Sequence, residues 1–191
     1  MRIQQVTYPT GTLITLAEAK AHLRVTIDNE DSVINDCIKS ATSLVESYTN
    51  QYLQSRTFVA FLDIQEFTAF NVIDIWKFPI TSIESIKYLD SSGVEQTFST
   101  ANYTTDLIDS PSRILPTTIA TVKLNIVNQY RIYFTAGHLT RESIDSELIG
   151  WIKIFTAFFY QTRQPEYTGQ PVSEIAYNYQ SALDKFNKGP L

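Results

Sequence analysis

The sequence predicts an α+β protein in which an N-terminal pair of helices and a later long helix form a helical core. Apolar residues recur at helical spacing over residues 15–50, alternate with period two between 54 and 137, and return to helical spacing over 143–162. The middle segment therefore predicts an antiparallel β-block inserted between the two parts of the helical core. Helices and strands do not alternate along the chain, which argues against a parallel sheet of βαβ units.

The chain of 191 residues is long enough for one domain with a sizeable insertion. We expect residues 1–165 to form this single domain, and residues 166–191 to form a linker and an extended C-terminal tail. Pro165, Gly169 and Pro171 are typical of such a linker.

Two helices are expected in the N-terminal segment. Thr15 followed by Glu18 is the signature of a capping box, in which each side chain satisfies a backbone N–H at the start of a helix. The second helix begins in the acidic residues 28–31 and ends at Asn50. Its apolar stripe consists of Val33, Ile34, Cys37, Ile38, Ala41, Leu44, Val45 and Tyr48. Cys37 lies on this stripe, where a buried and inert thiol is expected.

The β-block is expected to contain a hairpin whose loop includes Gly93 at a left-handed position. Tyr130, Ile132 and Phe134 alternate onto one face of the last strand. The chain around Ser110–Pro111 is expected to be irregular. Strands are expected over residues 56–63, 72–78, 83–89, 94–98, 123–127 and 130–135.

The third helix, over residues 143–162, is apolar on more than one side. Ile144, Leu148, Ile152, Phe155 and Phe159 line one face of this helix. Trp151, Ile154 and Phe158 add a second apolar side. A helix with so wide an apolar arc either fills the centre of its domain or meets a neighbouring subunit, so these three residues are the candidate subunit interface.

Composition excludes several classes of protein. The net charge is -5 and no segment concentrates Lys or Arg, so a protein that grips nucleic acid is not expected, whereas a surface along which DNA slides is compatible with the charge. The single cysteine forms no disulfide within the chain. No apolar run has membrane-spanning length, and residues 1–10 do not resemble a signal peptide. The 11 tyrosines and 11 phenylalanines fit either a β-rich core or interfaces.

The search for catalytic chemistry gives no candidate. His22 and His138 have no Cys, Asp or Glu at ligand spacing, and no nucleophile, metal or phosphate-binding motif occurs. The acidic groups fall at predicted helix starts, where capping and the helix dipole account for them. These acidic residues are Asp28, Glu30, Asp31, Asp145 and Glu147. We therefore predict no catalytic, cofactor-binding or metal-binding residue.

Four segments in order resemble the head–tail connector (adaptor) proteins of bacteriophages, in particular their longer members with an inserted β-block. ITLAEAKAHLRV with DNEDSVINDCIKSATSLVESYTNQYL is similar to the family's opening helices, and FPITSIESIKYLDSSGVEQTF to its strand and hairpin. YRIYFTAGH and ELIGWIKIFTAFFYQTRQP are similar to the following strand and helix. The opening motif matches at Leu16, Glu18, Ala19, Lys20, His22, Leu23, Arg24, Asp28, Asp31, Tyr48 and Thr49. Asn50 stands where the family usually has Gly, and Phe134 where it usually has Tyr.

The resemblance implies a structural protein of the virion neck, made in the cytoplasm of the host bacterium. It implies a homo-oligomeric ring, commonly of twelve subunits, that binds below the portal, extends the DNA channel without sequence-specific binding and docks a stopper or tail-completion protein. No cofactor and no membrane is implied. In related proteins the C-terminal segment often reaches the portal, and the corresponding residues here are Tyr177, Tyr179, Leu183 and Phe186. The alternative for this segment is a helix packed on its own domain.

Two other functions stay open at this point. The chain could be another neck or tail-completion protein of a virion, although such proteins are usually β-barrels without the paired helices. The other alternative is a small soluble enzyme with a scattered site.

Overall fold

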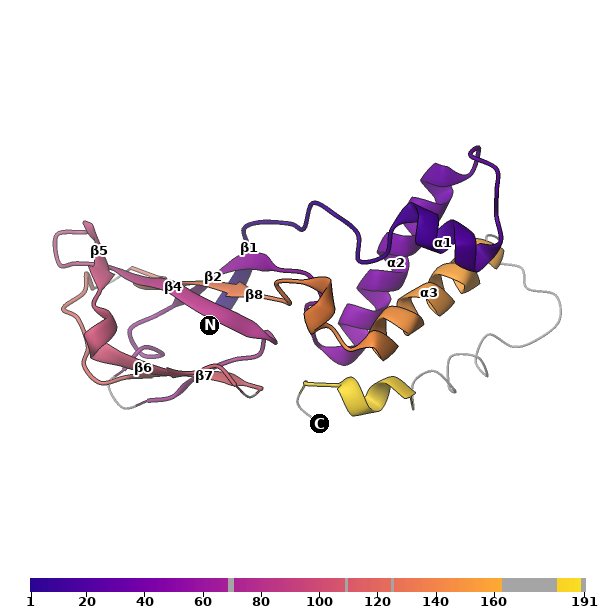
Figure 1. Ribbon diagram of the computed structural model, residues 1–191. Helices are drawn as coiled ribbons and strands as arrows, with labels where there is room; N and C mark the ends of the chain where they lie inside the picture. Colours follow the sequence, from indigo (N-terminus) through magenta and orange to yellow (C-terminus); the bar gives the residue numbers. More distant parts are fainter. Residues whose placement is uncertain (69–70, 109, 125, 163–181, 190–191) are drawn as a thin grey trace. The chain divides into compact units, whose positions relative to one another are not determined.

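The computed structural model describes residues 1–68, 71–108, 110–124, 126–162 and 182–189 (Figure 1). Its helices are α1 (Leu16–Leu23), α2 (Asp31–Thr49) and α3 (Ser146–Gln161). Its strands are β1 (Arg2–Gln5), β2 (Arg56–Leu62), β3 (Ile73–Ile75), β4 (Ile80–Leu89), β5 (Glu95–Phe98), β6 (Tyr103–Asp106), β7 (Ser112–Pro116) and β8 (Tyr130–Ala136). Short 3₁₀ turns lie at Thr100–Asn102, Arg141–Ser143 and Asp184–Phe186. The predicted α+β class is confirmed.

The chain separates into two compact units. The β-unit contains residues 1–9 and 54–139, and the helical unit contains residues 10–53 together with the described residues from 140 to 189. The expectation of a single domain over residues 1–165 stays a prediction. Residues 1–9 differ from the expectation, because they belong to the β-unit.

The ends of the helices follow the sequence signals. Thr15 and Glu18 form the predicted capping box at the start of α1, and Arg24 closes this helix in the left-handed conformation. Asn50 ends α2 with φ of 52°, a conformation that asparagine tolerates better than most residues.

The helical core is formed between α2 and α3, which lie side by side, with α1 against both (Figure 1). Ile34 and Ile38 of α2 and Ile152 of α3 are completely buried. Further members of this core are Leu13, Ile14, Ala19, Ala41, Val45, Leu53, Ile144, Leu148, Ile149, Phe155 and Leu183. Cys37 is buried, as predicted.

The described C-terminal residues belong to the helical unit. The side chain of Leu183 is buried in its core, and Phe186 packs against that core. The backbone N–H of Lys188 donates to the carbonyl of Thr49 at 2.9 Å. Residues 182–189 therefore pack on their own unit, which was the alternative expected for this segment.

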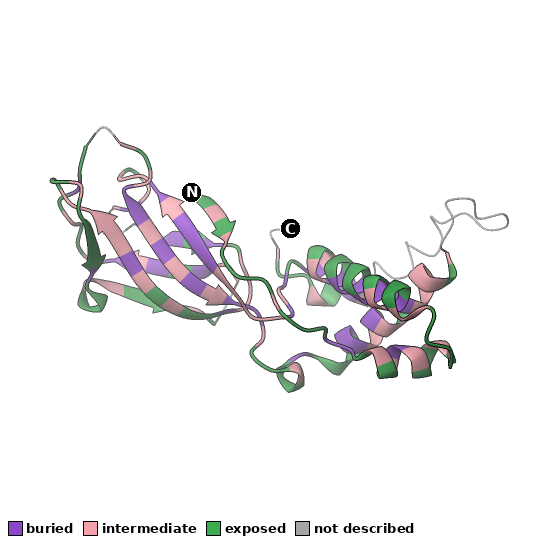
Figure 2. Ribbon diagram, turned by 90° about the horizontal axis from the view of Figure 1, so that it is seen from above, coloured by how far each residue is buried: buried purple, intermediate pink, exposed green. Residues whose placement is uncertain are grey.

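The β-unit contains a five-stranded antiparallel sheet in the order β1-β2-β8-β4-β5 and a three-stranded antiparallel sheet in the order β3-β7-β6. Tyr130, Ile132 and Phe134 of the central strand β8 are buried on one face, as predicted. Figure 2 shows buried and more exposed residues alternating along these strands. The hairpin of β4 and β5 is also confirmed, and Gly93 in its loop has φ of 83°.

Three expectations for strands were wrong. Residues 123–127 contain no strand among their described positions, and the neighbouring Val122 makes only an isolated bridge with Asp90. The segment expected to be irregular contains β6 and β7, and β1 was not expected. These strands have four or five residues, too few for an apolar period, so their pairing partners determine them.

We predict that Leu183→Ala lowers the free energy of unfolding of the helical unit by about 2–3 kcal/mol, because it leaves a cavity in the core. Urea unfolding followed by Trp151 fluorescence measures the effect in a Trp76→Phe background, which leaves one tryptophan. Lys185→Ala is the matched control, since its exposed ion pair with Glu147 contributes little. Equal stability of the two variants would show that the C-terminal segment does not support the core.

Candidate functional site

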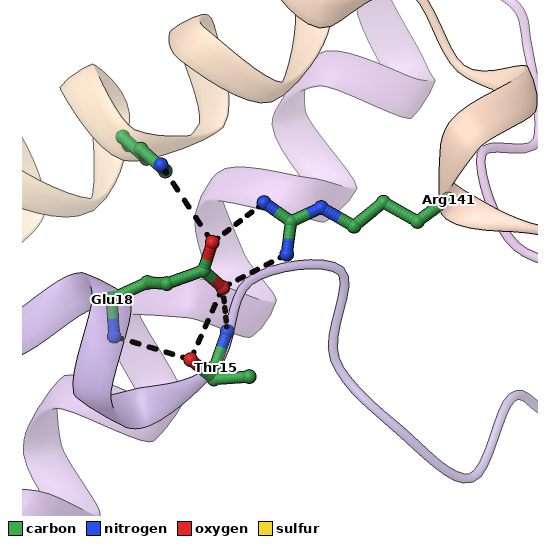
Figure 3. Close-up of polar contacts among 4 residues, drawn as sticks. Thr15, Glu18 and Arg141 are labelled. Carbon is green, nitrogen blue, oxygen red and sulfur yellow. Dashed lines mark hydrogen bonds and ion pairs between the residues drawn. The ribbon is translucent and has the colours of Figure 1, made fainter.

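The opening motif of the sequence forms a polar cluster in the helical unit. Arg141 donates from both terminal nitrogens to the carboxylate of Glu18, at 2.9 Å to Oε2 and 2.7 Å to Oε1 (Figure 3). The same carboxylate accepts from the backbone N–H of Thr15 at 2.8 Å, and Nζ of Lys153 lies 3.8 Å from it. Glu18 thus joins the start of α1 to the segment before α3 and to α3 itself. This fork geometry needs a guanidinium, which lysine does not provide.

These contacts stabilise the charged form of Glu18. The hydrogen bonds from Arg141, followed by that from the Thr15 backbone, lower the pKa of Glu18 from 4.5 to about 2, although partial burial opposes the shift. The carboxylate is therefore ionised throughout the neutral range. A group whose charge is fixed in this way positions helices and is not suited to exchange protons near neutral pH.

The other acidic candidates have structural roles. Nζ of Lys20 lies 2.6 Å from Asp28 and 2.7 Å from Asp31, which ties α1 to the start of α2. Asp145 caps α3 by accepting from the backbone N–H of Glu147 at 2.8 Å. Glu147 forms an ion pair with Lys185, and Glu30 accepts from the hydroxyl of Tyr160.

The histidines do not converge on a metal-type site. His22 is exposed on α1, and His138 is half buried after β8. Among the described residues, no group of three or more His, Cys, Asp or Glu side chains could hold a metal ion.

The outer face of α3 is defined by Gly150, Trp151, Ile154, Ala157 and Phe158, which lie on one side of the helix. Ile154 is 37% exposed, while Trp151 and Phe158 are half buried. Trp151 also packs partly against the helical core. The predicted interface residues thus lie along one side of α3, but Trp151 serves the core as well.

Charge is nearly absent from α3. Its only charged residues are Glu147 in the first turn and Lys153, which is directed toward Glu18. A solvated helix face usually carries several charged side chains. The outer face of α3 therefore has the character of a surface that becomes covered.

Of the four candidate portal-binding residues, two lie within the described ranges. Tyr177 and Tyr179 lie outside the described residues. Leu183 and Phe186 are engaged in the helical unit, so their predicted contact with a portal stays a prediction. Sequence reasoning missed Arg141, because no local pattern links it to Glu18 across 123 positions.

We predict that Glu18→Gln destabilises the helical unit at pH 7 by about 1 kcal/mol, a value that allows for solvent screening. The folded-state pKa of Glu18 is depressed, so its stabilisation is present above about 4.5 and is lost as the pH falls toward about 2. The difference between wild type and Glu18→Gln in urea midpoint should shrink over that range. Arg141→Lys should fall between them at pH 7; identical curves for all three proteins would contradict a structural role of the fork.

None of the helices in the described ranges is long and apolar enough to cross a membrane. The comparison with curated proteins gave no match. Among solved structures, the chain is similar to one from the neck of an empty gene transfer agent particle computed with C6 symmetry, with a TM-score of 0.79, 20% identity and coverage of 100% of this chain and 97% of the other.

Two further structures have the same coverage and 19% identity. One is from the virion of the native gene transfer agent, with a TM-score of 0.78, and the other from the native neck computed with C12 symmetry, with a TM-score of 0.75. At this identity the likeness shows that the fold is shared. The model of the phage gp6-like head–tail connector proteins matches residues 13–131, which include α1, α2 and most of the β-unit. The chain therefore belongs to the phage gp6-like head–tail connector family.

Proposed function

We propose that this chain is one subunit of a homo-oligomeric ring in the neck of a virion. Membership of the connector family supports the structural role, and similar chains occur in particle necks computed with C6 and C12 symmetry. The observation that carries the proposal is the outer face of α3, which is exposed at Ile154 and uncharged between Glu147 and Gln161 apart from Lys153. A ring of about twelve copies would cover this face with a neighbouring subunit.

Family membership removes the enzyme alternative, because the family consists of structural head–tail connectors. It also favours a connector over the other neck and tail-completion proteins. Membership of the family thus confirms the expectation from the sequence that this is a non-enzymatic connector protein.

We infer three partners of the ring from the connector role. The portal would bind on one side and a stopper or tail-completion protein on the other, while DNA passes through the ring. The net charge of -5 suits passage, since an acidic wall repels phosphate and does not hold it. The protein would be made in the bacterial cytoplasm before it joins the particle.

We predict that Ile154→Glu prevents ring formation while the subunit stays folded, because a charge on the covered face would be buried without a partner. Electron microscopy of particle necks and sedimentation velocity measure assembly, and circular dichroism measures folding. Lys39→Glu is the control, since Lys39 is an exposed residue of α2 whose ion pair with Asp36 lies on the surface. Rings of Ile154→Glu at the wild-type level would rule out the outer face of α3 as an interface.

We predict that the double variant Tyr177→Ala/Tyr179→Ala folds normally but binds the portal more than tenfold more weakly, because aromatic side chains dominate many binding surfaces. Co-purification and titration with the portal measure this effect. Substitution is preferable to truncation, which would remove the core residue Leu183. Unchanged binding would show that these two tyrosines do not form the portal contact.

A further inference from the structure

A ring generated by rotation needs two different patches on each subunit, one for each neighbour. The outer face of α3 supplies only one of them. We propose that the second is the α2 strip, defined by Val33, Ser40, Leu44 and Ser47, and that α3 of one copy packs against the α2 strip of the next. This inference rests on the proposed ring, and it names the partner surface of the same interface.

The α2 strip lies on one side of the helix and outside the core. The strip follows the alternating spacing of four and three residues that keeps side chains on one side of a helix. The residues with this spacing are Val33, the bordering Cys37, Ser40, Leu44 and Ser47. Val33 is 36% and Leu44 40% exposed, and both serines are exposed. The buried face of α2 lies elsewhere, with Ile34, Ile38, Ala41 and Val45 completely buried.

The strip lacks charge. The two charged residues beside it, Asp36 and Lys39, pair with each other at 3.3 Å on the exposed surface. This ion pair lies at the border of the strip, where each charge keeps a partner. Exposed Val and Leu without interspersed charge therefore give α2 a second apolar surface, separate from its core face.

The side chains on the outer face of α3 are complementary in size to those of the α2 strip. Trp151, Ile154 and Phe158 on α3 repeat with spacings of three and four residues, so they form a row of large side chains. Ser40 leaves space between Val33 and Leu44, and Ser47 leaves space beyond Leu44, in which such side chains can insert. Helix packing places the ridges of one helix in the grooves of the other, and the serines provide such grooves on α2.

Gly150 supports close approach of a second helix. Among the described residues, a Cβ placed on Gly150 would meet nothing within 4 Å, so none of them requires glycine there. Glycine inside a helix nevertheless costs up to about 1 kcal/mol relative to alanine. A neighbouring helix that approaches the backbone of α3 gives a reason for this residue. A second copy is the occupant that carries a matching strip, and similar chains occur in necks with rotational symmetry.

Cysteine cross-linking tests the pairing directly. Leu44→Cys and Ile154→Cys are combined in a Cys37→Ala background of the full chain, rings are assembled, and the rings are oxidised and run on a non-reducing denaturing gel. Because each subunit would be linked to both neighbours, the double variant should give a ladder beyond the dimer. The two single variants should stay monomeric, and a mixture of them should give a dimer only.

Lys39→Cys combined with Ile154→Cys in the same background is the matched control, since Lys39 lies on α2 outside the strip, and it should give no ladder. A dimer from Ile154→Cys alone would indicate that two α3 faces meet and would overturn the pairing. Absence of a ladder from rings seen by electron microscopy would also overturn it, while the proposed ring would stand. If the wild-type chain forms no ring in the particle or with the portal, the proposed function itself fails.

Discussion

The packing of α2 against α3 is the interaction on which the helical unit depends. The two helices are encoded on either side of the β-block, yet Ile34, Ile38 and Ile152 meet in one core without exposure to solvent. Most of the stability of a helix in a protein comes from the packing of its apolar face, so each of these helices requires the other. The fork between Arg141 and Glu18 joins the same two segments of the chain. The connector motif at the start of the sequence is thus explained first by folding, because its glutamate holds together parts that are distant in sequence.

This packing uses only one side of α3. The inner side, with residues such as Phe155, is buried in the core, whereas Ile154 on the outer face is exposed. A monomer gains no stability from leaving such side chains in water, and exposed apolar patches in soluble proteins commonly mark interaction surfaces. The inner side of α3 therefore serves folding, and its outer face is available for assembly. Changes on its inner side should act on folding, and a change at the exposed Ile154 should act on assembly.

The features that could be predicted from the sequence are those with local signals. The capping box at Thr15, the left-handed end of α2 at Asn50 and the alternation in β8 each depend on a few neighbouring residues, and all three are present. In the second sheet, β3 lies inside the strand expected over residues 72–78, but β6 and β7 were missed. Strands such as β6 are exposed and short and gain their conformation from pairing. The role of Arg141 could not be predicted either, since nothing near it in sequence indicates a partner in α1. The fold class could thus be inferred from periodicity, whereas pairings between distant segments required the structure.

The α2 helix shows how a single apolar stripe in a sequence can contain two surfaces. Val33, Ile34, Leu44 and Val45 belong to the same stripe by spacing, but the structure buries Ile34 and Val45 and leaves Val33 and Leu44 exposed. The same division occurs on α3, where residues of one wide apolar arc separate into a core side and an outer face. A periodicity argument cannot make this division, because the direction of the packing partner is not encoded in the spacing. Each of the two helices keeps an uncharged second face, and the face on α2 alternates Val and Leu with serines. The two faces provide complementary surfaces on a single chain, and repeated contact between copies is the simplest arrangement that covers both.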